Sequence, residues 1–452
     1  MRQRPLAGWA VCRWAEVVIG FQKSYRTLRL RLQAIAAILF CLLAPLLSWS
    51  DPSTPIAITH VTILDVRDGS TKAEMTVLIS GNRISSVGPS KDIPLPRQVQ
   101  IVDGQGKFLI PGLWDMHVHT NGDARALRLL LASGITGVRD MGGDVAKLAE
   151  SRRRVANGDL VGPRLLFAGP MLKGPPAEPD NDVWVIHSPD EGRRAVNSLA
   201  DLHVDFIKVH DGLARDSFLA IVETAKTRGL TFAGHVPVSM TPLDVSNLGQ
   251  KSIEHFEFLP KPCLALVDPD SRAAHRVPPG CDRESLDSLL RRFAQNGTWL
   301  DPTIQSFRYF APTRWDAIFA GFRELAVQIR QNNVQIFTGT DWSDYLEEKG
   351  ARPGGSLHDE LGLLVDAGFT PLEVLRASTL NPALFFGLAD SLGTIEPGKN
   401  ADLVLLEANP LDDIRNTKRI VAVISEGRLL DRKTLDGMLA AAAANLPTSS
   451  VH

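Results

Sequence analysis

Hydrophobic and polar positions change their period along the chain. Between residues 56 and 110, short apolar runs such as Ile56–Thr59 alternate with turn formers, which is typical of β-strands. After Pro111–Gly112, β-branched runs alternate with segments of helical period, and this predicts parallel strands joined by crossover helices. The all-β pattern returns after Leu392, for example in Ala401–Leu406. We therefore expect an α/β fold with β segments on both sides of it.

The middle region contains eight candidate strands. They end near His119, Asp140, Gly169, His210, His235, His255, Asp301 and Asp341. Helix-like segments lie between them, including 216–228, 283–296 and 357–367. Eight β/α units in about 280 residues is the size of a TIM-type (β/α)8 barrel, which we assign to residues 113–392.

The two flanking β regions are too short to bury a face separately. We expect residues 51–112 and 393–435 to pair into one small composite β-sandwich. The alanine-rich stretch after Leu435 predicts a helix, followed by a tail, in residues 436–452. No internal repeat or low-complexity linker interrupts this organisation.

The first 50 residues have the pattern of a secretory signal. Three arginines, the last of them Arg31, precede the apolar run Leu32–Leu47, and Ser48–Ser50 follows it. This predicts a leader in residues 1–50 and an exported body, periplasmic or secreted, that begins near Asp51. An uncleaved anchor is the alternative, because the run approaches the ~20 residues that span a bilayer.

Composition and charge narrow the classes of partner. Hydrophobic residues make up 44% and charged residues 22%, which excludes a disordered chain and a polytopic membrane protein. Without the leader, 42 basic and 50 acidic residues remain, a net charge of −8. No basic field or motif for nucleic acid is present, and no membrane contact is expected beyond the leader. A homo-oligomer is compatible with the sequence, but no exposed apolar stripe indicates its interface.

Four cysteines are present, and two of them, Cys12 and Cys41, belong to the leader. The others, Cys263 and Cys281, lie in a stretch rich in Pro and Asp. In an oxidising compartment they can form a disulfide worth ~3 kcal/mol of loop-closure entropy. Two unpaired thiols are the alternative.

Candidate chemistry begins at Asp115–His119, where the first barrel strand ends. A period of two places His117 and His119 on one inward face, although a lone His-x-His is a weak metal signal. Position strengthens it, because catalytic groups of such barrels lie at the carboxyl ends of the strands. Further candidate ligands at these ends are Lys208, His235, His255 and Asp341.

Six motifs together resemble the amidohydrolase superfamily. They are Pro111–His119, Gly134–Asp140, Ile253–His255, Thr338–Asp341, Leu380–Ala383 and Gly393–Leu403. More narrowly, the chain resembles the imidazolonepropionase-related, Xaa-Pro dipeptidase-like branch. The resemblance covers nearly the whole chain after residue 51.

The resemblance implies a centre with two divalent metals. One metal would be held by His117, His119 and Asp341 and the other by His235 and His255, with carboxylated Lys208 bridging both. A carbamate offers two oxygens to two dications, whereas a free lysine cation would repel them. Zinc suits imidazole and carboxylate ligands, which do not exclude manganese, cobalt or iron. The alternative for Lys208 is an inward lysine paired with an acid.

The same resemblance implies hydrolysis by a hydroxide that bridges the metals. Asp341 would orient it, take its proton and pass the proton to the leaving nitrogen, as ligand and general acid/base. His210 faces the same way as Lys208 and is a candidate to polarise the carbonyl, although the branch often has tyrosine there. A packing role for His210 is the alternative.

Two residues are candidates to bind substrate. Arg139 ends the second strand, and its guanidinium can receive both oxygens of a carboxylate. A salt bridge to Asp140 or Asp115 is the alternative. His358 follows the eighth strand and is a candidate to line the pocket.

The sequence thus predicts an exported, dinuclear metal-dependent amidohydrolase. Its substrate would be a small-molecule amide with a free carboxylate, either a dipeptide (Xaa-Pro-like) or an N-acyl amino acid. A cyclic-amide hydrolase of the imidazolonepropionase type is the alternative enzyme, disfavoured by Lys208 and by export. A non-catalytic binding member of the fold is the alternative from another class, and retention of all six candidate ligands disfavours it.

Overall fold

The structure is a computed structural model, which describes residues 54–256, 259 and 282–444. The predicted leader, Cys263 and Cys281 lie outside the described residues. No described helix has both the length and the apolar character needed to cross a membrane.

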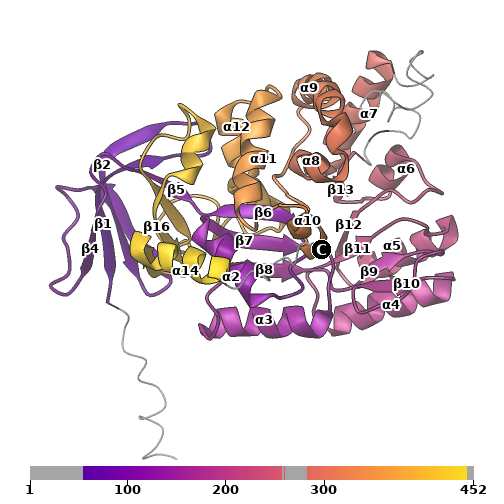
Figure 1. The fold of residues 1–452 in the computed structure, drawn as a ribbon, viewed down its shortest axis with the longest axis horizontal. Coiled ribbons are helices and arrows are strands. Elements are labelled where there is room, and N and C mark those ends of the chain that lie inside the picture. The colour runs from indigo at the N-terminus through magenta and orange to yellow at the C-terminus, as the bar shows by residue number, and fades with distance from the viewer. Residues whose placement is uncertain (1–53, 257–258, 260–281, 445–452) are drawn as a thin grey trace, which may run out of the picture. The chain divides into compact units, whose positions relative to one another are not determined.

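The two flanking β regions pair with each other in one mixed sheet of eight strands (Figure 1). Its strands are β1 (Ile56–Leu64), β2 (Thr71–Ser80), β3 (Arg83–Pro89), β4 (Gln100–Asp103), β5 (Phe108–Pro111), β15 (Leu403–Leu406), β16 (Ile420–Ser425) and β17 (Arg428–Asp431). The order is β17-β16-β15-β5-β1-β2-β3, with β4 also on β1. Antiparallel pairing of β15 with β5, for example Val404 opposite Ile110, joins the two regions. A second packed sheet and the domain boundaries stay predictions.

The middle region forms two parallel sheets. The first contains β6 (Leu113–Val118), β7 (Ile135–Asp140) and β8 (Arg164–Phe167). The second has the order β10 (Val183–Val185), β9 (Met171–Lys173), β11 (Phe206–Val209), β12 (Thr231–Gly234), β13 (Ser252–Glu254) and β14 (Trp299–Asp301). Both carry their candidate site residues at the carboxyl ends of the strands, as expected for β/α units.

Helices connect these strands and pack against them (Figure 1). The longer ones are α2 (Ala124–Ala132), α3 (Val145–Asn157), α4 (Pro189–Asp201), α5 (Arg215–Thr227), α7 (Arg283–Asn296), α9 (Trp315–Gln331), α11 (Gly355–Asp366) and α14 (Arg432–Ala444). Shorter ones are α6 (Pro242–Asn247), α8 (Phe307–Phe310), α10 (Asp344–Glu348), α12 (Pro371–Ala377) and α13 (Leu380–Phe385). The predictions for 216–228, 283–296 and 357–367 are confirmed within two residues.

Caps fix where these helices begin and end. The side chain of Asp282 accepts the backbone N–H of Ser285 at the start of α7, and Gly297 ends the helix at φ 67°. This left-handed conformation suits glycine, which has no Cβ to clash with the preceding turn. The helix therefore has both of its end signals in the sequence.

The eighth predicted strand takes a different form. Residues 336–342 make only two isolated bridges, Leu300 with Ile336 and Val118 with Trp342. The N–H of Met116 still donates to the carbonyl of Thr338 at 2.9 Å, which holds this segment beside β6. These contacts are compatible with a closed barrel, and closure itself stays a prediction.

Alternation along the strands separates the core from the site. In β11, Ile207 and Val209 belong to the large apolar cluster that also contains Phe218 and Ile221 of α5. Phe206 belongs to another cluster, with Ala233 of the neighbouring strand β12. Because successive side chains point to opposite faces, Lys208 and His210 share the face of Phe206, away from α5.

Candidate metal centre

All six candidate metal ligands line one pocket of about 390 Å³. Its lining is His117, His119, Lys208, His210, His235, His255, Ser306, Phe307, Phe310 and Asp341. The ligands come from five separate chain segments, so the fold brings together residues that are distant in sequence. His210 lies in the same pocket, as expected.

The first group has the spacing of ligands around one metal. The Nε2 atoms of His117 and His119 lie 3.3 and 3.4 Å from the same oxygen, Oδ1 of Asp341. Ligand atoms about 2.0–2.1 Å from a tetrahedral zinc are about 3.3 Å apart. Nε2 of His117 is buried and has no hydrogen-bond partner within the protein. These three side chains therefore fit a divalent metal.

The second group continues from the first through the imidazole rings. The ring centroid of His255 lies 4.8 Å from that of His117 and 4.9 Å from that of His235. Nδ1 of His255 lies 2.6 Å from Oγ1 of Thr303, which leaves Nε2 as its ligand atom. Nδ1 of His235 is buried without a hydrogen-bond partner. Each ring thus offers one nitrogen that a second metal can use.

Lys208 reaches the same pocket from β11 and is only 1% exposed. Burial lowers its pKa from 10.5 to about 8, against the opposite influence of Glu254 and Asp341. Gly234 makes room for its stem, because a Cβ there would lie 2.1 Å from the carbonyl of Val209 and 3.0 Å from Cδ of Lys208. The site therefore holds an amine whose neutral form is accessible near neutral pH.

Electrostatics leave the ligands in the forms that bind metals. Burial, followed by the nearby positive charge of Lys208, lowers the pKa of His117 and His235 well below the usual value. Burial raises the pKa of Asp341, but His255 and His119 lower it to a net value below the usual one. Neutral imidazoles and an ionised carboxylate are the states that metals need.

Two of the candidate ligands have strained backbones. His255 has φ 56° and Asp341 has φ 55°, in the left-handed region that residues with a Cβ seldom adopt. Such strain is common where a side chain must be aimed at a functional site. The turn at His255 also breaks strand alternation, so that both Glu254 and His255 reach the interior.

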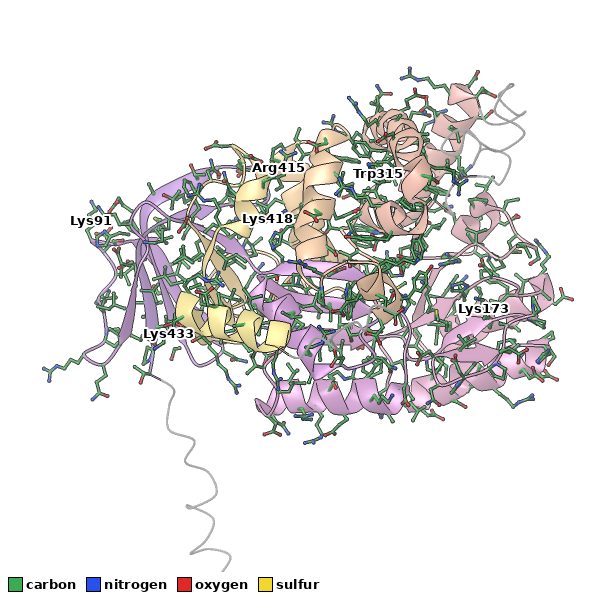
Figure 2. All side chains as sticks on the ribbon, in the orientation of Figure 1. Lys91, Lys173, Trp315, Arg415, Lys418 and Lys433 are labelled. Carbon is green, nitrogen blue, oxygen red and sulfur yellow. The ribbon has the colours of Figure 1, made fainter. Side chains whose placement is uncertain are left out.

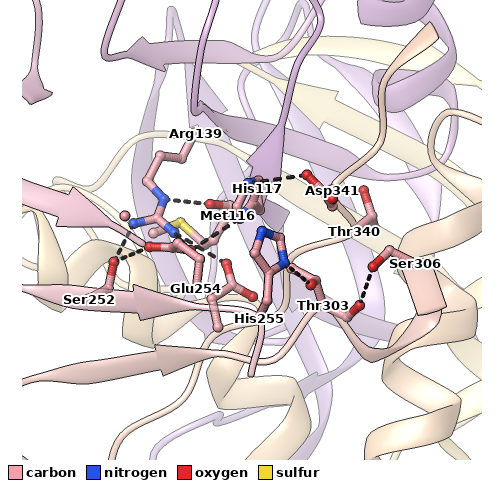
Figure 3. A network of polar contacts seen from close by, with 12 residues as sticks. Met116, His117, Arg139, Ser252, Glu254, His255, Thr303, Ser306, Thr340 and Asp341 are labelled. Atoms are coloured by element: carbon pink, nitrogen blue, oxygen red, sulfur yellow. Dashed lines mark hydrogen bonds and ion pairs between the residues drawn. The ribbon is translucent and has the colours of Figure 1, made fainter. Parts of the chain in front are cut away.

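Beneath the histidines lies a buried charged network that sequence reasoning missed (Figure 3). We call it the floor, defined as Arg139, Ser252, Glu254 and Asp301. Oε2 of Glu254 lies 3.1 Å from Nδ1 of His117 and 2.7 Å from the guanidinium of Arg139. By accepting the Nδ1 proton, Glu254 leaves Nε2 of His117 free for a metal. Its place beside a ligand in Ile253–His255 was the available signal, but alternation would have turned it outward.

The prediction that Arg139 binds a substrate carboxylate is wrong. Its side chain is fully buried in the floor, where it donates to the Met116 carbonyl and, at 2.8 Å, to Oγ of Ser252. Its positive charge is balanced by the carboxylates of Glu254 and, at 3.2 Å, of Asp301. The predicted alternative partners, Asp140 and Asp115, are not the ones that it pairs with. With four of its five N–H groups directed at these partners and its side chain fully buried, this guanidinium is not open to a ligand.

The prediction that His358 lines the pocket is also wrong. His358 lies on α11 and is 4% exposed, and its two ring nitrogens contact Thr417 and Ser133. These contacts link α11 to other helices and turns. His358 therefore has a packing role. Helix α11 begins at Gly355, three residues before His358, and the residue is not part of the pocket lining.

His210 lies above the ligands in the pocket. Its ring stacks on His235 with 3.8 Å between centroids, and its Nδ1 accepts the backbone N–H of Asp211 at 2.8 Å. Burial, and then the neighbouring His235 and Lys208, lowers the pKa of His210 well below the usual value. A neutral ring with Nδ1 as acceptor carries its proton on Nε2, which is therefore a donor.

Comparison with known proteins decides the family. The model of the amidohydrolase family matches residues 108–430. The chain belongs to the amidohydrolase family. Members of this family are hydrolases that act on carbon–nitrogen bonds and generally depend on metals, in agreement with the ligand groups described above.

Individual members are related to the chain only distantly. An ochratoxinase from Aspergillus niger is 25% identical over 85% of this chain and 88% of its own length. An imidazolonepropionase from Sphingopyxis alaskensis is 24% identical over 73% of this chain and 85% of its own length. The structure of a Xaa-Pro dipeptidase with bound methionine has a TM-score of 0.67 and 22% identity, covering 84% of this chain and 100% of that one. The last comparison shows a shared amidohydrolase fold, of TIM-barrel type.

Proposed function

We propose that this protein is an exported amidohydrolase with two divalent metals that cleaves an amide C–N bond. Its substrate is a dipeptide, Xaa-Pro-like, or an N-acyl amino acid with a free carboxylate. The observation that carries the proposal is the convergence of six ligand side chains from five segments in one pocket. The signal-like residues 1–50 support export, and the family match supports the reaction class.

The residues present fit the two metals that the family implies. His117, His119 and Asp341 would hold one, and His235 and His255 the other, with a carbamate on Lys208 between them. The lowered pKa of Lys208, about 8, supports the carbamate, because only a neutral amine adds to CO2. Divalent cations held there, of which zinc suits these ligands best, would supply a water of lowered pKa and Lewis-acid polarisation of the scissile carbonyl.

The protein's own groups then handle protons and charge. Oδ1 of Asp341 lies within 3.4 Å of Nε2 of His117 and of Nε2 of His119. The carboxylate of Asp341 is therefore next to the position of the attacking water and can accept its proton. It then returns that proton to the leaving nitrogen as a general acid. Nε2–H of His210 is a donor for the oxygen of the carbonyl as negative charge develops there.

A cyclic-amide hydrolase is the second candidate. The similarity to the imidazolonepropionase from Sphingopyxis alaskensis supports it, at 24% identity over 73% of the chain. Lys208 in the pocket favours the first proposal, because in its carboxylated form it would offer oxygen ligands to two metals.

Substrate and metal assays separate the candidates. Protein purified with zinc and bicarbonate is assayed for bound metal and for turnover of Xaa-Pro dipeptides, N-acyl amino acids and imidazolone propionate. We expect about two metals per chain and turnover of an open-chain amide. Turnover of imidazolone propionate alone would establish the second candidate. Less than about one metal per chain, with no turnover, would indicate a non-catalytic member of the fold.

A Lys208→Ala variant tests the bridge. Losing a residue that only supports a metal ligand typically costs about 10–100-fold in metal affinity or activity. Losing a ligand itself should cost more, so we expect kcat/KM to fall about 100-fold or more. A short-chain carboxylic acid should restore part of the activity. Lys226→Ala, an exposed lysine on α5, is the matched control and should retain full activity. Full turnover by Lys208→Ala without added acid would overturn the dinuclear proposal.

A further inference from the structure

Strand β9, which the sequence did not predict, places a lysine beside the pocket. Leu172 of β9 pairs with Val209 of β11, and both side chains lie in the apolar cluster on the helix side. Paired residues of parallel strands face the same way, so Lys173 shares the face of His210. Met171 shares it too and lies next to His119, since both would contact a Cβ added at Gly142.

The backbone of Lys173 is fixed on both sides. The N–H of His210 donates to the carbonyl of Leu172 at 2.9 Å, and the N–H of Ile186 donates to the carbonyl of Lys173 at 2.8 Å. After it, Gly174 packs so closely that an added Cβ would lie 1.9 Å from the carbonyl of Gly212. The half-buried side chain therefore starts from a fixed point (labelled in Figure 2).

The charge of Lys173 is not met within the described part of the chain. No hydrogen bond or ion pair of its ammonium is found there, in contrast to Arg139 with its two carboxylates. A half-buried ammonium without a partner in the described residues, on the same face as His210, favours an anion.

We propose that Lys173 is a specificity-determining residue that binds the carboxylate of the substrate's leaving amino acid. This inference rests on the proposed function and supplies the cation that Arg139 cannot provide. In an N-acyl amino acid or dipeptide, the carboxylate is one carbon from the leaving nitrogen. The flexible four-carbon side chain of Lys173 lets its ammonium reach this carboxylate while the scissile carbonyl lies between the candidate metal ligands and His210.

Binding of matched probes tests the inference. N-acetyl-L-leucine and the neutral N-acetyl-L-leucinamide are titrated calorimetrically into the zinc-loaded full chain and its variants. We expect the wild type to prefer the carboxylate probe. Lys173→Met should weaken that probe about 10- to 100-fold, the worth of a hydrogen bond to a charged group, and leave the amide unchanged. Lys173→Arg should retain most of the preference.

Controls separate this inference from the proposed function. Lys91→Met removes an exposed lysine next to β3, outside the pocket lining, and should bind both probes like the wild type. An equal affinity of the wild type for both probes, or an unchanged preference in Lys173→Met, would overturn the role of Lys173. Hydrolysis of open-chain amides is measured on the same samples, so loss of the preference with hydrolysis retained leaves the proposed function standing.

Discussion

Two cations near the ends of parallel strands in separate sheets, Arg139 on β7 and Lys173 on β9, show how depth decides the role of a charge. Both lie on inward faces. Arg139 lies below the histidines, fully buried, and contacts Glu254, Asp301 and Ser252. Lys173 lies level with His210, half-buried, without such partners in the described residues. The deeper cation is part of the structure, whereas the shallower one is left for a ligand.

The cost of burial explains the difference. A guanidinium without water needs carboxylates and hydrogen bonds around it, and the floor provides them. The rings of Phe337 and Phe385 also lie 5.4 and 5.5 Å from the guanidinium carbon of Arg139. In the outer part of the pocket around His210, which we call the mouth, solvent and substrate can neutralise a charge instead. The following changes test this contrast between floor and mouth.

Removing the floor cation should have the largest effect. Arg139→Met leaves Glu254 and Asp301 buried without their partner, and breaking a buried ion pair costs about 3–5 kcal/mol. We expect a loss of that size in the free energy of unfolding from urea denaturation.

The matched control for Arg139→Met is Arg67→Met. Arg67 pairs with Asp65 at 2.6 Å, but its side chain is 51% exposed, so its loss should cost less than about 1 kcal/mol. Wild-type stability of Arg139→Met, together with a raised KM for carboxylate substrates, would restore Arg139 as a substrate-binding residue.

Glu254→Gln should weaken metal binding rather than folding. The amide keeps the shape but no longer fixes the proton of His117 on Nδ1, and losing such a partner typically costs 10–100-fold in metal affinity. Competition with a chelator measures this. Asp402→Asn, which changes a buried carboxylate that precedes β15 and pairs with Arg164 of β8, should leave metal affinity unchanged. Equal affinities of wild type and Glu254→Gln would make Glu254 only a partner of Arg139.

Much of this molecule could be predicted from its sequence. Long periodic segments identify helices such as α7, because the cap at Asp282 and the glycine at 297 are local signals. The ligand residues could be grouped because strand ends of a parallel sheet meet at one edge. These inferences need only local sequence and one rule of topology.

The remainder depends on tertiary contacts that no local pattern encodes. The sequence places Arg139 at a strand end, and only the packing around it shows that it is paired in the interior. Glu254 reaches His117 because His255 takes φ 56°, a turn that alternation does not anticipate. Strand β9 has three residues, too few for a period to be recognised.

Glu360, a buried carboxyl on α11, should make stability depend on pH. Burial raises the pKa of Glu360 from 4.5 to about 8, although it accepts the N–H groups of Ile304 and Gln305. The folded state therefore holds a proton that the unfolded state releases, so this contribution to stability is lost as pH rises from about 4.5 to 8.

In Glu360→Gln, the free energy of unfolding should fall less steeply over this pH range than in the wild type. Urea denaturation at several pH values measures the slope. Glu407→Gln removes an exposed carboxylate and should retain the wild-type slope. Identical slopes for Glu360→Gln and the wild type would show that Glu360 is ionised in the folded protein.

The smallest effect on activity is expected at His358, which the sequence, like Arg139, suggested as a candidate to bind substrate. Its contacts, Nδ1 to Thr417 at 3.0 Å and Nε2 to the carbonyl of Ser133 at 2.9 Å, join helices rather than meet the pocket. His358→Phe leaves the part-buried carbonyl of Ser133 without this partner, whereas Oγ1 of Thr417 still donates to the carbonyl of Ile414, so we expect a loss of about 1–3 kcal/mol in stability. kcat/KM measured well below the melting temperature should stay within about twofold, since no pocket residue loses a contact. A tenfold loss of kcat/KM at unchanged stability would instead indicate that His358 contributes to the pocket, and that α11 forms part of the pocket wall.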